Sequence, residues 1–259
     1  MTARAPAPES RGRVESYLIE QFATGPTHFT LIDPDKSPGA RAGAIARGAV
    51  SLGSHLILLG GSTGISPDVI GEAARAVKAA VSVPVVIFPQ GLDSISPAAD
   101  AVLFMSLLNS RNLDLVVRAH ARAAPMIRSI GLEPIPMGYL VIAPGMRVGE
   151  VGQVDVVARD DPASAAGYAL AAQYLGMRFV YLEAGSGAPS PVPAALVRAV
   201  RDVVSIPVIV GGGIRSAVDA RRLLEAGANA LVTGTIAEEE GLGEAFRGIV
   251  QEVGRARGR

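Results

Sequence analysis

The sequence predicts an α/β fold: a single (β/α)8 TIM barrel with an extra helix before its first strand. From residue 28 onward, short apolar segments alternate with Ala-, Leu-, Val- and Arg-rich segments of helical period, as in repeated βαβ units. The 259 residues match the length at which such barrels form one domain. Three of the strand candidates end in glycine, as expected at the ligand-binding face of a barrel.

Eight segments are predicted to be strands, and most are near-continuous apolar runs, as strands buried on both faces should be. They span residues 28–32, 55–59, 83–88, 101–105, 135–142, 179–182, 207–210 and 230–233. Helices between them have recognisable starts, where Ser, Asp or Pro supplies a cap or a first turn. These starts are Ser66-Pro67, Asp161-Pro162 and Ser216, and the stops are Gly53, Gly176 and Gly227, where a left-handed residue is expected.

Two parts of the chain depart from this repeated unit. Only residues 91–100, with Pro97 among them, connect the third and fourth strands, so we do not expect a full helix there and predict an irregular third βα unit. A helix over about residues 14–22 is expected to close the bottom of the barrel. We therefore divide the chain into a flexible leader, 1–13, and a barrel domain, 14–259. The leader has no apolar run and does not resemble a signal peptide.

Composition excludes several classes of function. Lys plus Arg and Asp plus Glu balance at 24 each, which argues against nucleic acid as a partner. The sequence contains no cysteine, so disulfides and thiol catalysis are excluded, and a cytoplasmic location is expected. No apolar run is long enough for a transmembrane helix.

Glycines after predicted strands two, seven and eight point to a phosphate site. The segments are Gly60-Gly61-Ser62, Gly211-Gly212-Gly213-Ile214-Arg215 and Gly234-Thr235. Glycine lets backbone N–H groups approach an anion closely, and the loops after strands seven and eight are the usual phosphate site of a barrel. The alternative for the glycine triplet is a tight turn without a ligand.

Acidic residues follow two other strands. Asp33 and Glu183 both end strands at the same mouth, where a carboxylate beside phosphate loops needs a cation or a hydroxyl partner. Asp33 therefore suggests Mg²⁺, and Glu183 a substrate hydroxyl, although Asp33-Pro34-Asp35 alone could be a solvated turn. The three histidines lack metal or catalytic spacing, and we expect surface or hydrogen-bonded structural positions for them.

Together these motifs resemble the geranylgeranylglyceryl phosphate synthase family, from about His28 to Ile236 and in the same order. The segments that carry the resemblance are Leu31-Ile32-Asp33-Pro34-Asp35-Lys36, Gly60-Gly61-Ser62, Leu107-Leu108-Asn109-Ser110, Gly138-Tyr139-Leu140, Tyr181 to Gly187, Gly211 to Arg215 and Gly234-Thr235. The resemblance implies a Mg²⁺-dependent prenyltransferase that joins the geranylgeranyl group of geranylgeranyl diphosphate to the 3-hydroxyl of sn-glycerol 1-phosphate. This reaction forms the first ether bond of archaeal-type membrane lipids.

The resemblance also assigns residues. Asp33 and Ser62 match the magnesium positions. The glycerol phosphate site matches Tyr181, Leu182, Glu183, Ala184, Gly185, Ser186, Gly187, Gly212, Gly213, Gly234 and Thr235. Glu183, Tyr181 and Asp33 are the expected catalytic residues, with Glu183 either orienting the attacking hydroxyl or accepting its proton.

The sequence leaves alternatives for the prenyl channel, the chain length of the donor and the oligomeric state. The prenyl tail needs an apolar channel, for which Val86, Phe88, Leu103, Met105 and Met137 are candidates, although core positions are the simpler interpretation. The chain has no tryptophan to block such a channel, and the twenty-carbon donor is favoured by resemblance alone. The resemblance implies a homo-oligomer, either a dimer or a hexamer, and leaves transient contact with a membrane surface open. Rival hypotheses are a sugar-phosphate isomerase or epimerase and a non-catalytic barrel that binds a phosphorylated metabolite.

Overall fold

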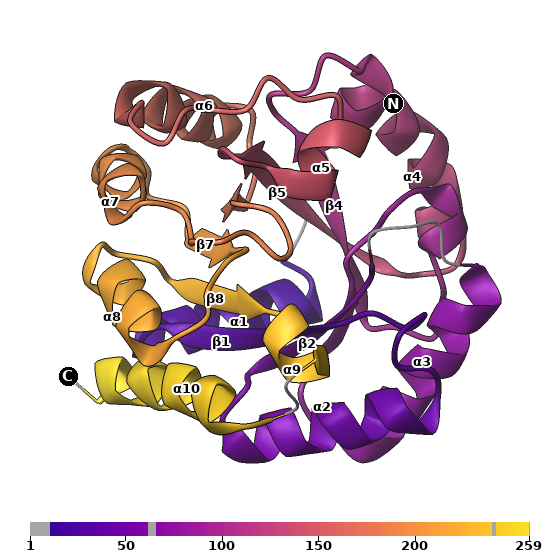
Figure 1. The fold of residues 1–259 in the computed structure, drawn as a ribbon. Helices are drawn as coiled ribbons and strands as arrows, with labels where there is room; N and C mark the ends of the chain where they lie inside the picture. The colour runs from indigo at the N-terminus through magenta and orange to yellow at the C-terminus, as the bar shows by residue number, and fades with distance from the viewer. Residues whose placement is uncertain (1–10, 62–65, 240–241, 259) are drawn as a thin grey trace, which may run out of the picture.

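The computed structural model describes residues 11–61, 66–239 and 242–258, which form a closed barrel of parallel strands ringed by helices (Figure 1). Each strand pairs with the next along the chain, and β1 closes the barrel on β8. The predicted (β/α)8 barrel is confirmed. The described strands are β1 (Thr27–Ile32), β2 (Leu56–Leu59), β3 (Val85–Ile87), β4 (Ala101–Leu107), β5 (Glu133–Val141), β6 (Phe179–Glu183), β7 (Val208–Gly211) and β8 (Ala230–Thr233).

Helices surround the barrel and lie across its ends. They are α1 (Arg13–Thr24), α2 (Ala40–Leu52), α3 (Pro67–Ala80), α4 (Ala119–Ser129), α5 (Met146–Val151), α6 (Pro162–Tyr174), α7 (Ala194–Val203), α8 (Ala217–Glu225), α9 (Thr235–Glu239) and α10 (Glu244–Arg257), with a 3₁₀ helix η1 (Leu92–Ser94) and a π-helix η2 (Asp114–Arg118). Within the described ranges, none of these has both the length and the apolar character needed to cross a membrane.

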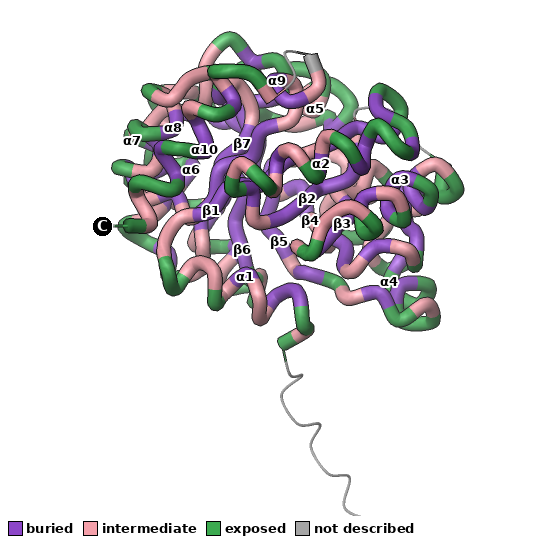
Figure 2. Tube along the Cα trace, turned by 90° about the horizontal axis from the view of Figure 1, so that it is seen from below, coloured by how far each residue is buried: buried purple, intermediate pink, exposed green. Residues whose placement is uncertain are grey.

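The strands are buried on both faces (Figure 2). Inward side chains such as Phe29, Leu56 and Phe179 fill the barrel, while outward ones such as Ile57 and Val210 pack under the helices. This two-sided burial explains why the strands are continuous apolar runs in the sequence.

The predicted helix boundaries are confirmed in detail. The side chains of Ser66, Asp161 and Ser216 each accept a hydrogen bond from the backbone N–H three residues later. At the helix ends, Gly53, Gly176 and Gly227 have φ of 116°, 82° and 101°. A side chain would be strained at these angles, which is why glycine ends these helices.

The third βα unit is irregular, as predicted. Between β3 and β4 the chain forms only the 3₁₀ turn η1. The fourth unit also departs from a regular helix, because the π-helix η2 precedes α4. The Ser106 hydroxyl donates to the Val116 carbonyl of η2 at 2.8 Å.

Helix α1 closes the N-terminal end of the barrel, as expected. Val14 and Leu18 belong to the same apolar cluster as the barrel interior, and Phe22 packs edge-on against Phe179 with ring centroids 5.9 Å apart. Figure 2 shows α1 beneath the strands at this end. The helix begins at Arg13, so the last predicted leader residue is already helical.

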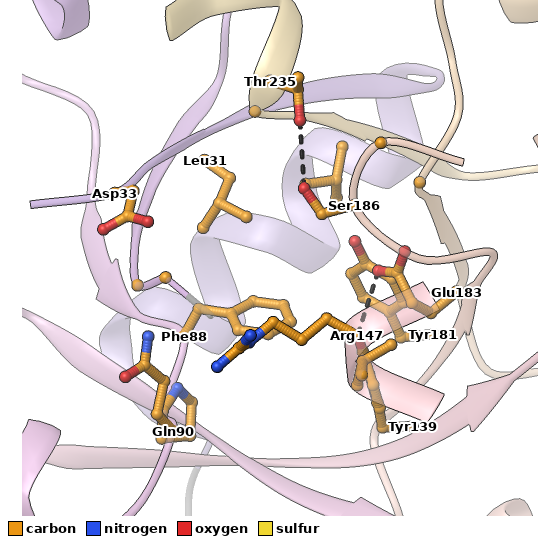
Figure 3. A pocket seen from close by; sticks show the side chains of 18 of the residues that line it. Leu31, Asp33, Phe88, Gln90, Tyr139, Arg147, Tyr181, Glu183, Ser186 and Thr235 are labelled. Atoms are coloured by element: carbon orange, nitrogen blue, oxygen red, sulfur yellow. Dashed lines mark hydrogen bonds between the residues drawn. The ribbon is translucent and has the colours of Figure 1, made fainter. Parts of the chain in front are cut away.

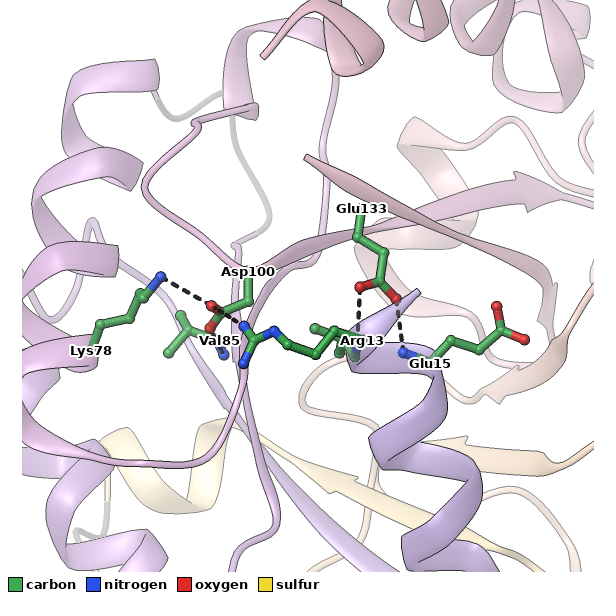
Figure 4. A network of polar contacts seen from close by, with 7 residues as sticks. Arg13, Glu15, Lys78, Val85, Asp100 and Glu133 are labelled. Carbon is green, nitrogen blue, oxygen red and sulfur yellow. Dashed lines mark hydrogen bonds and ion pairs between the residues drawn. The ribbon is translucent and has the colours of Figure 1, made fainter. Parts of the chain in front are cut away.

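A carboxylate from β5 caps α1 (Figure 4). Glu133 accepts hydrogen bonds from the backbone N–H groups of Val14 and Glu15, both at 2.8 Å. Gly12 leaves room for this, since a Cβ there would lie 2.1 Å from the Glu133 carboxyl carbon. Beside this cap, Asp100 binds Arg13 at 2.8 Å and Lys78 at 3.0 Å. The barrel base thus holds α1 through long-range polar contacts.

His28 occupies a buried structural position. One ring nitrogen is 2.7 Å from the Ser54 hydroxyl and the other is 3.0 Å from the Thr233 hydroxyl. Burial, with the nearby His55 charge, lowers the pKa of His28 to about 3, so the ring is neutral at physiological pH. His120 bonds the Met105 carbonyl through Nε2 at 2.6 Å. These positions agree with the structural roles expected for the histidines.

Candidate active site

A cavity of about 610 Å³ opens at the C-terminal ends of the strands. Its walls come from the ends of β1, β4, β5, β6 and β8 and from the segments that follow β1, β2, β3, β6, β7 and β8, with α5 and α9 at the rim (Figure 3). Its size suits a small-molecule site, and its place in the barrel is where such sites form.

Glu183 lies in the wall of this cavity and is only 6% exposed. It ends β6, and strand alternation turns Tyr181 and Glu183 inward while Leu182 packs outside the barrel. Its carboxylate accepts the Gly185 N–H at 2.6 Å and the Tyr139 hydroxyl at 3.1 Å (Figure 3).

Burial sets the protonation of this group. Desolvation raises the pKa of Glu183, opposed by the Gly185 N–H and by the hydroxyls of Tyr139 and Tyr181. Burial also raises the pKa of both tyrosines well above 10.0, so their hydroxyls stay protonated and can donate hydrogen bonds. A buried carboxylate with a raised pKa, oriented by two donors, is suited to accept a proton.

Glycines at the end of β7 make room for these side chains. A Cβ at Gly211 would lie 1.9 Å from the Tyr181 hydroxyl, and one at Gly212 would lie 2.2 Å from Glu183 Oε1. Gly212 and Gly213 also have φ of 80° and 68°, which disfavour a side chain. Gly211 and Gly212 therefore leave the space that the Tyr181 and Glu183 side chains occupy.

The rim above Glu183 is polar. Ser186 and Thr235 form a hydrogen bond of 3.1 Å that joins the loops after β6 and β8 (Figure 3). Gly187, Gly213 and Gly234 line the cavity beside them. These are the residues that the sequence predicted around a phosphate.

Asp33 lies across the cavity from Glu183 (Figure 3). A Cβ on Gly61 would lie 2.5 Å from its carboxylate, so glycine is needed there as well. Burial raises the pKa of Asp33, opposed by the Asp35 N–H, which binds Oδ1 at 3.1 Å, and by Lys36, while the Asp35 charge adds to the increase. The predicted metal partner Ser62 lies outside the described residues.

The donor set on this side fits Mg²⁺ only in combination with a substrate. Among the described residues, no group of three or more His, Asp or Glu side chains could hold a metal ion alone. Mg²⁺ commonly takes one or two carboxylates from the protein and completes its shell with phosphate oxygens and water. One buried carboxylate facing a cavity wide enough for a diphosphate is consistent with that mode.

An apolar wall continues from the polar part of the cavity. Phe88, Met105, Leu107, Leu115 and Val148 line it. Of the five candidates for a prenyl channel, Phe88 and Met105 are in this wall. The other three, Val86, Leu103 and Met137, are buried deeper in the barrel, as core residues.

Most predicted site residues come together in this cavity. Those that line it are Asp33, Tyr181, Glu183, Ser186, Gly187, Gly212, Gly213, Gly234 and Thr235. Leu182 and Ala184 instead pack between barrel and helices, and Gly185 contributes its N–H to Glu183.

The lining residues that the sequence analysis did not assign to the site include Tyr139, Arg147 and Glu238. The inward direction of the Tyr139 side chain is predictable from strand alternation, since Tyr139 pairs in register with Tyr181 on β6. Arg147 reaches into the cavity from α5 (Figure 3), and Glu238 comes from α9. Neither short helix has a clear sequence pattern, so these two positions depend on the tertiary fold.

The chain is similar to known proteins over most of its length. A sequence profile of the PcrB family matches residues 20–253. Geranylgeranylglyceryl phosphate synthase of Thermococcus gammatolerans is 48% identical over 242 residues, 93% of this chain and 96% of the relative. The synthase of Pyrococcus horikoshii is 49% identical over 228 residues, 88% and 90% of the two chains.

A solved structure matches equally well. The crystal structure of (S)-3-O-geranylgeranylglyceryl phosphate synthase from Thermoplasma acidophilum, in complex with its substrate sn-glycerol 1-phosphate, superposes with a TM-score of 0.89 at 46% identity. The match covers 94% of this chain and 99% of that one.

Proposed function

The chain belongs to the PcrB family, with the geranylgeranylglyceryl phosphate synthases as its relatives, and from this we propose that it is a prenyltransferase acting on sn-glycerol 1-phosphate. The reaction joins the geranylgeranyl group of geranylgeranyl diphosphate to the 3-hydroxyl and forms the first ether bond of archaeal-type lipids. The carrying observation is the buried Glu183 beside the glycine-rich rim, in one cavity with an apolar wall. The isomerase, epimerase and non-catalytic hypotheses are set aside, because they do not match this family.

The residues divide the cavity between the two substrates. Backbone N–H groups of Gly212, Gly213, Gly234 and Thr235 would bind the phosphate of glycerol phosphate, as the loops after β7 and β8 do in phosphate-binding barrels. The prenyl chain would lie along the apolar wall at Phe88 and Met105. The diphosphate would then lie at Asp33, which faces Glu183 across the cavity (Figure 3).

The transfer breaks one carbon–oxygen bond of the prenyl donor and forms one to glycerol phosphate. The bond between prenyl C1 and the diphosphate oxygen breaks, and the leaving group carries away the bonding electrons. The 3-hydroxyl oxygen forms the new bond to C1, and its proton passes to the Glu183 carboxylate. Tyr139 holds that carboxylate in place, as its hydrogen bond of 3.1 Å indicates.

We propose Mg²⁺ as the cofactor, held by Asp33 and Ser62. When bound, it would neutralise charge on the leaving diphosphate. Asp33 supplies the carboxylate, positioned by its own turn: its backbone carbonyl accepts the N–H groups of Lys36 and Ser37 at 3.1 and 2.9 Å. A homo-oligomer, either dimer or hexamer, is a further proposal by family resemblance, and a cytoplasmic location is a further proposal from the lack of cysteine.

The function is tested by incubating the purified protein with radiolabelled sn-glycerol 1-phosphate and prenyl diphosphates of several lengths, with Mg²⁺ or with EDTA. We expect an ether product in the presence of Mg²⁺ only, with the twenty-carbon donor preferred. Absence of an ether product with every donor would refute the proposed function, and equal turnover in EDTA would refute the metal requirement alone.

A further inference from the structure

Glu238 of α9 connects two parts of the cavity that are far apart in the sequence. Its Oε1 accepts a hydrogen bond of 2.6 Å from the backbone N–H of Asp33. Its Oε2 lies 3.8 Å from the Lys36 ammonium group, and the side chain is only 6% exposed. A buried carboxylate from the eighth βα unit thus binds the end of the first strand.

The Glu238 carboxylate supplies an acceptor for the Asp33 N–H, which the strand ladders of the barrel leave unpaired. Pairing of β1 with β8 ends at Thr30, and pairing with β2 ends at Ile32. The Asp33 N–H therefore lies beyond both ladders, and Glu238 supplies its acceptor. A charge-assisted bond of this kind is stronger than one between neutral groups. It fixes the point at which the Asp33 carboxylate leaves the strand.

The same helix begins in the other half of the cavity. Thr235 opens α9 and binds Ser186 on the rim where we place glycerol phosphate. Helix α9 has five residues, and a helix that short has little stability of its own. Its geometry therefore depends on tertiary contacts: Ile236 and Ala237 pack in the apolar core, and Thr235 and Glu238 make the polar contacts towards its two ends.

We propose that Glu238 is a positioning residue that couples the two substrates. A glycerol phosphate that fixes Thr235 also fixes α9, and through the Glu238 bond it fixes Asp33 for the diphosphate. Because coupling between sites is reciprocal, the prenyl diphosphate tightens the binding of glycerol phosphate to the same degree. This inference rests on the proposed function, since it uses the proposed division of the cavity.

The test measures binding without turnover. The dissociation constant of sn-glycerol 1-phosphate is measured by calorimetry, alone and with saturating MgCl₂ plus geranylgeranyl thiolodiphosphate, an analogue whose bridging sulfur prevents transfer. In the wild-type protein we expect the analogue to tighten binding at least about fivefold, the lower end of typical coupling. In E238A the ratio should fall to about one.

Two further variants sharpen the result. E238Q keeps an oxygen acceptor for the Asp33 N–H and should recover part of the coupling, which a general packing defect would not allow. It also carries the test if E238A does not fold. E225A removes an exposed glutamate of α8 that does not line the cavity, and it should keep the wild-type ratio.

The inference is overturned if the wild-type ratio is one, or if folded E238A and E238Q both keep the wild-type ratio. Turnover of the wild-type protein, measured on the same preparation, separates the two claims. Normal prenyl transfer with no change in coupling refutes only the role of Glu238. Absence of both transfer and glycerol phosphate binding refutes the proposed function and, with it, this inference.

Discussion

At the scale of single residues, Glu183 makes the activity depend on pH. Burial raises its pKa above the ordinary 4.5, so it becomes protonated at a higher pH than an exposed glutamate would. A base must be deprotonated, so kcat/KM should fall with decreasing pH through this raised pKa, and the midpoint of the acid limb should lie above 4.5. A pH–rate profile with glycerol phosphate as the varied substrate measures this.

The raised pKa of Glu183 makes the free energy of unfolding depend on pH in the opposite direction to the activity. A carboxyl group with a raised pKa binds its proton more tightly in the folded state, so its contribution to the free energy of unfolding falls as pH rises through 4.5. Activity and stability therefore respond to Glu183 in opposite directions. An acid limb centred at or below 4.5 would contradict the role of this buried group as the base.

Two variants separate orientation from proton transfer at Glu183. Gln keeps an acceptor oxygen but loses charge and basicity, whereas Ala loses every contact. If Glu183 accepts the proton, both variants should lose kcat by about 10²- to 10⁴-fold. If it only orients the hydroxyl, Gln should keep substantial activity, and Ala should mainly raise KM for glycerol phosphate. We expect the large loss of kcat in both variants. Near-wild-type kinetics in the alanine variant would exclude both the orienting role and the base role.

Asp33→Asn tests the diphosphate side. Asn keeps the oxygen that accepts the Asp35 N–H, so the turn should survive, but it loses the charge offered to Mg²⁺. We expect kcat to fall by at least about 10²-fold with glycerol phosphate affinity nearly unchanged. Asp35→Asn is the matched control, because Asp35 is exposed and does not line the cavity. Metal-dependent activity equal to wild type in Asp33→Asn would remove this residue from the site.

How far the sequence predicts single residues depends on their place in the barrel. Asp33 and Glu183 were predictable, because both end strands whose apolar pattern is clear. Arg147 and Glu238 lie on the short helices after β5 and β8, and the direction of their side chains depends on loop geometry that no local pattern encodes. Leu182 and Ala184 were predicted to be site residues because they belong to a continuous motif. Strand alternation turns their side chains away from the cavity.

At the scale of elements, helix α1 depends on a distant cap. Glu133→Ala removes both hydrogen bonds to its first N–H groups, while Glu133→Gln keeps only one acceptor oxygen. We expect the alanine variant to lose about 1–3 kcal/mol of unfolding free energy and the glutamine variant less. Urea unfolding followed by circular dichroism measures both. Glu20→Ala, an exposed substitution within α1, is the control, and equal stability of Glu133→Ala and Glu20→Ala would contradict the capping role.

Element boundaries were predictable where a side chain acts on its own helix. Ser66, Asp161 and Ser216 cap locally, so their helices start where the sequence indicates. Gly12, at the start of α1, has no side chain, and its cap comes from residue 133, far along the chain. The π-helix η2 depends similarly on Ser106 of β4, which a local reading of residues 114–118 does not include.

At the scale of the whole molecule, the fold follows from repetition of one unit, and the site follows from closure of the barrel. Closure brings the ends of β1, β6, β7 and β8 to one mouth, although these strands are spread over more than two hundred residues. The fold class could therefore be predicted from pattern alone. The division of the cavity into two substrate halves needed the closed structure, because it depends on which strand ends face one another.

The central claim is that this mouth holds glycerol phosphate with its 3-hydroxyl at Glu183. The most direct test is a crystal structure with sn-glycerol 1-phosphate, Mg²⁺ and the thiolodiphosphate analogue. We expect the phosphate against the N–H groups of Gly212, Gly213, Gly234 and Thr235, the hydroxyl at about 3 Å from the Glu183 carboxylate, and the diphosphate at Asp33. Glycerol phosphate bound at Asp33, or bound with its hydroxyl away from Glu183, would contradict the account.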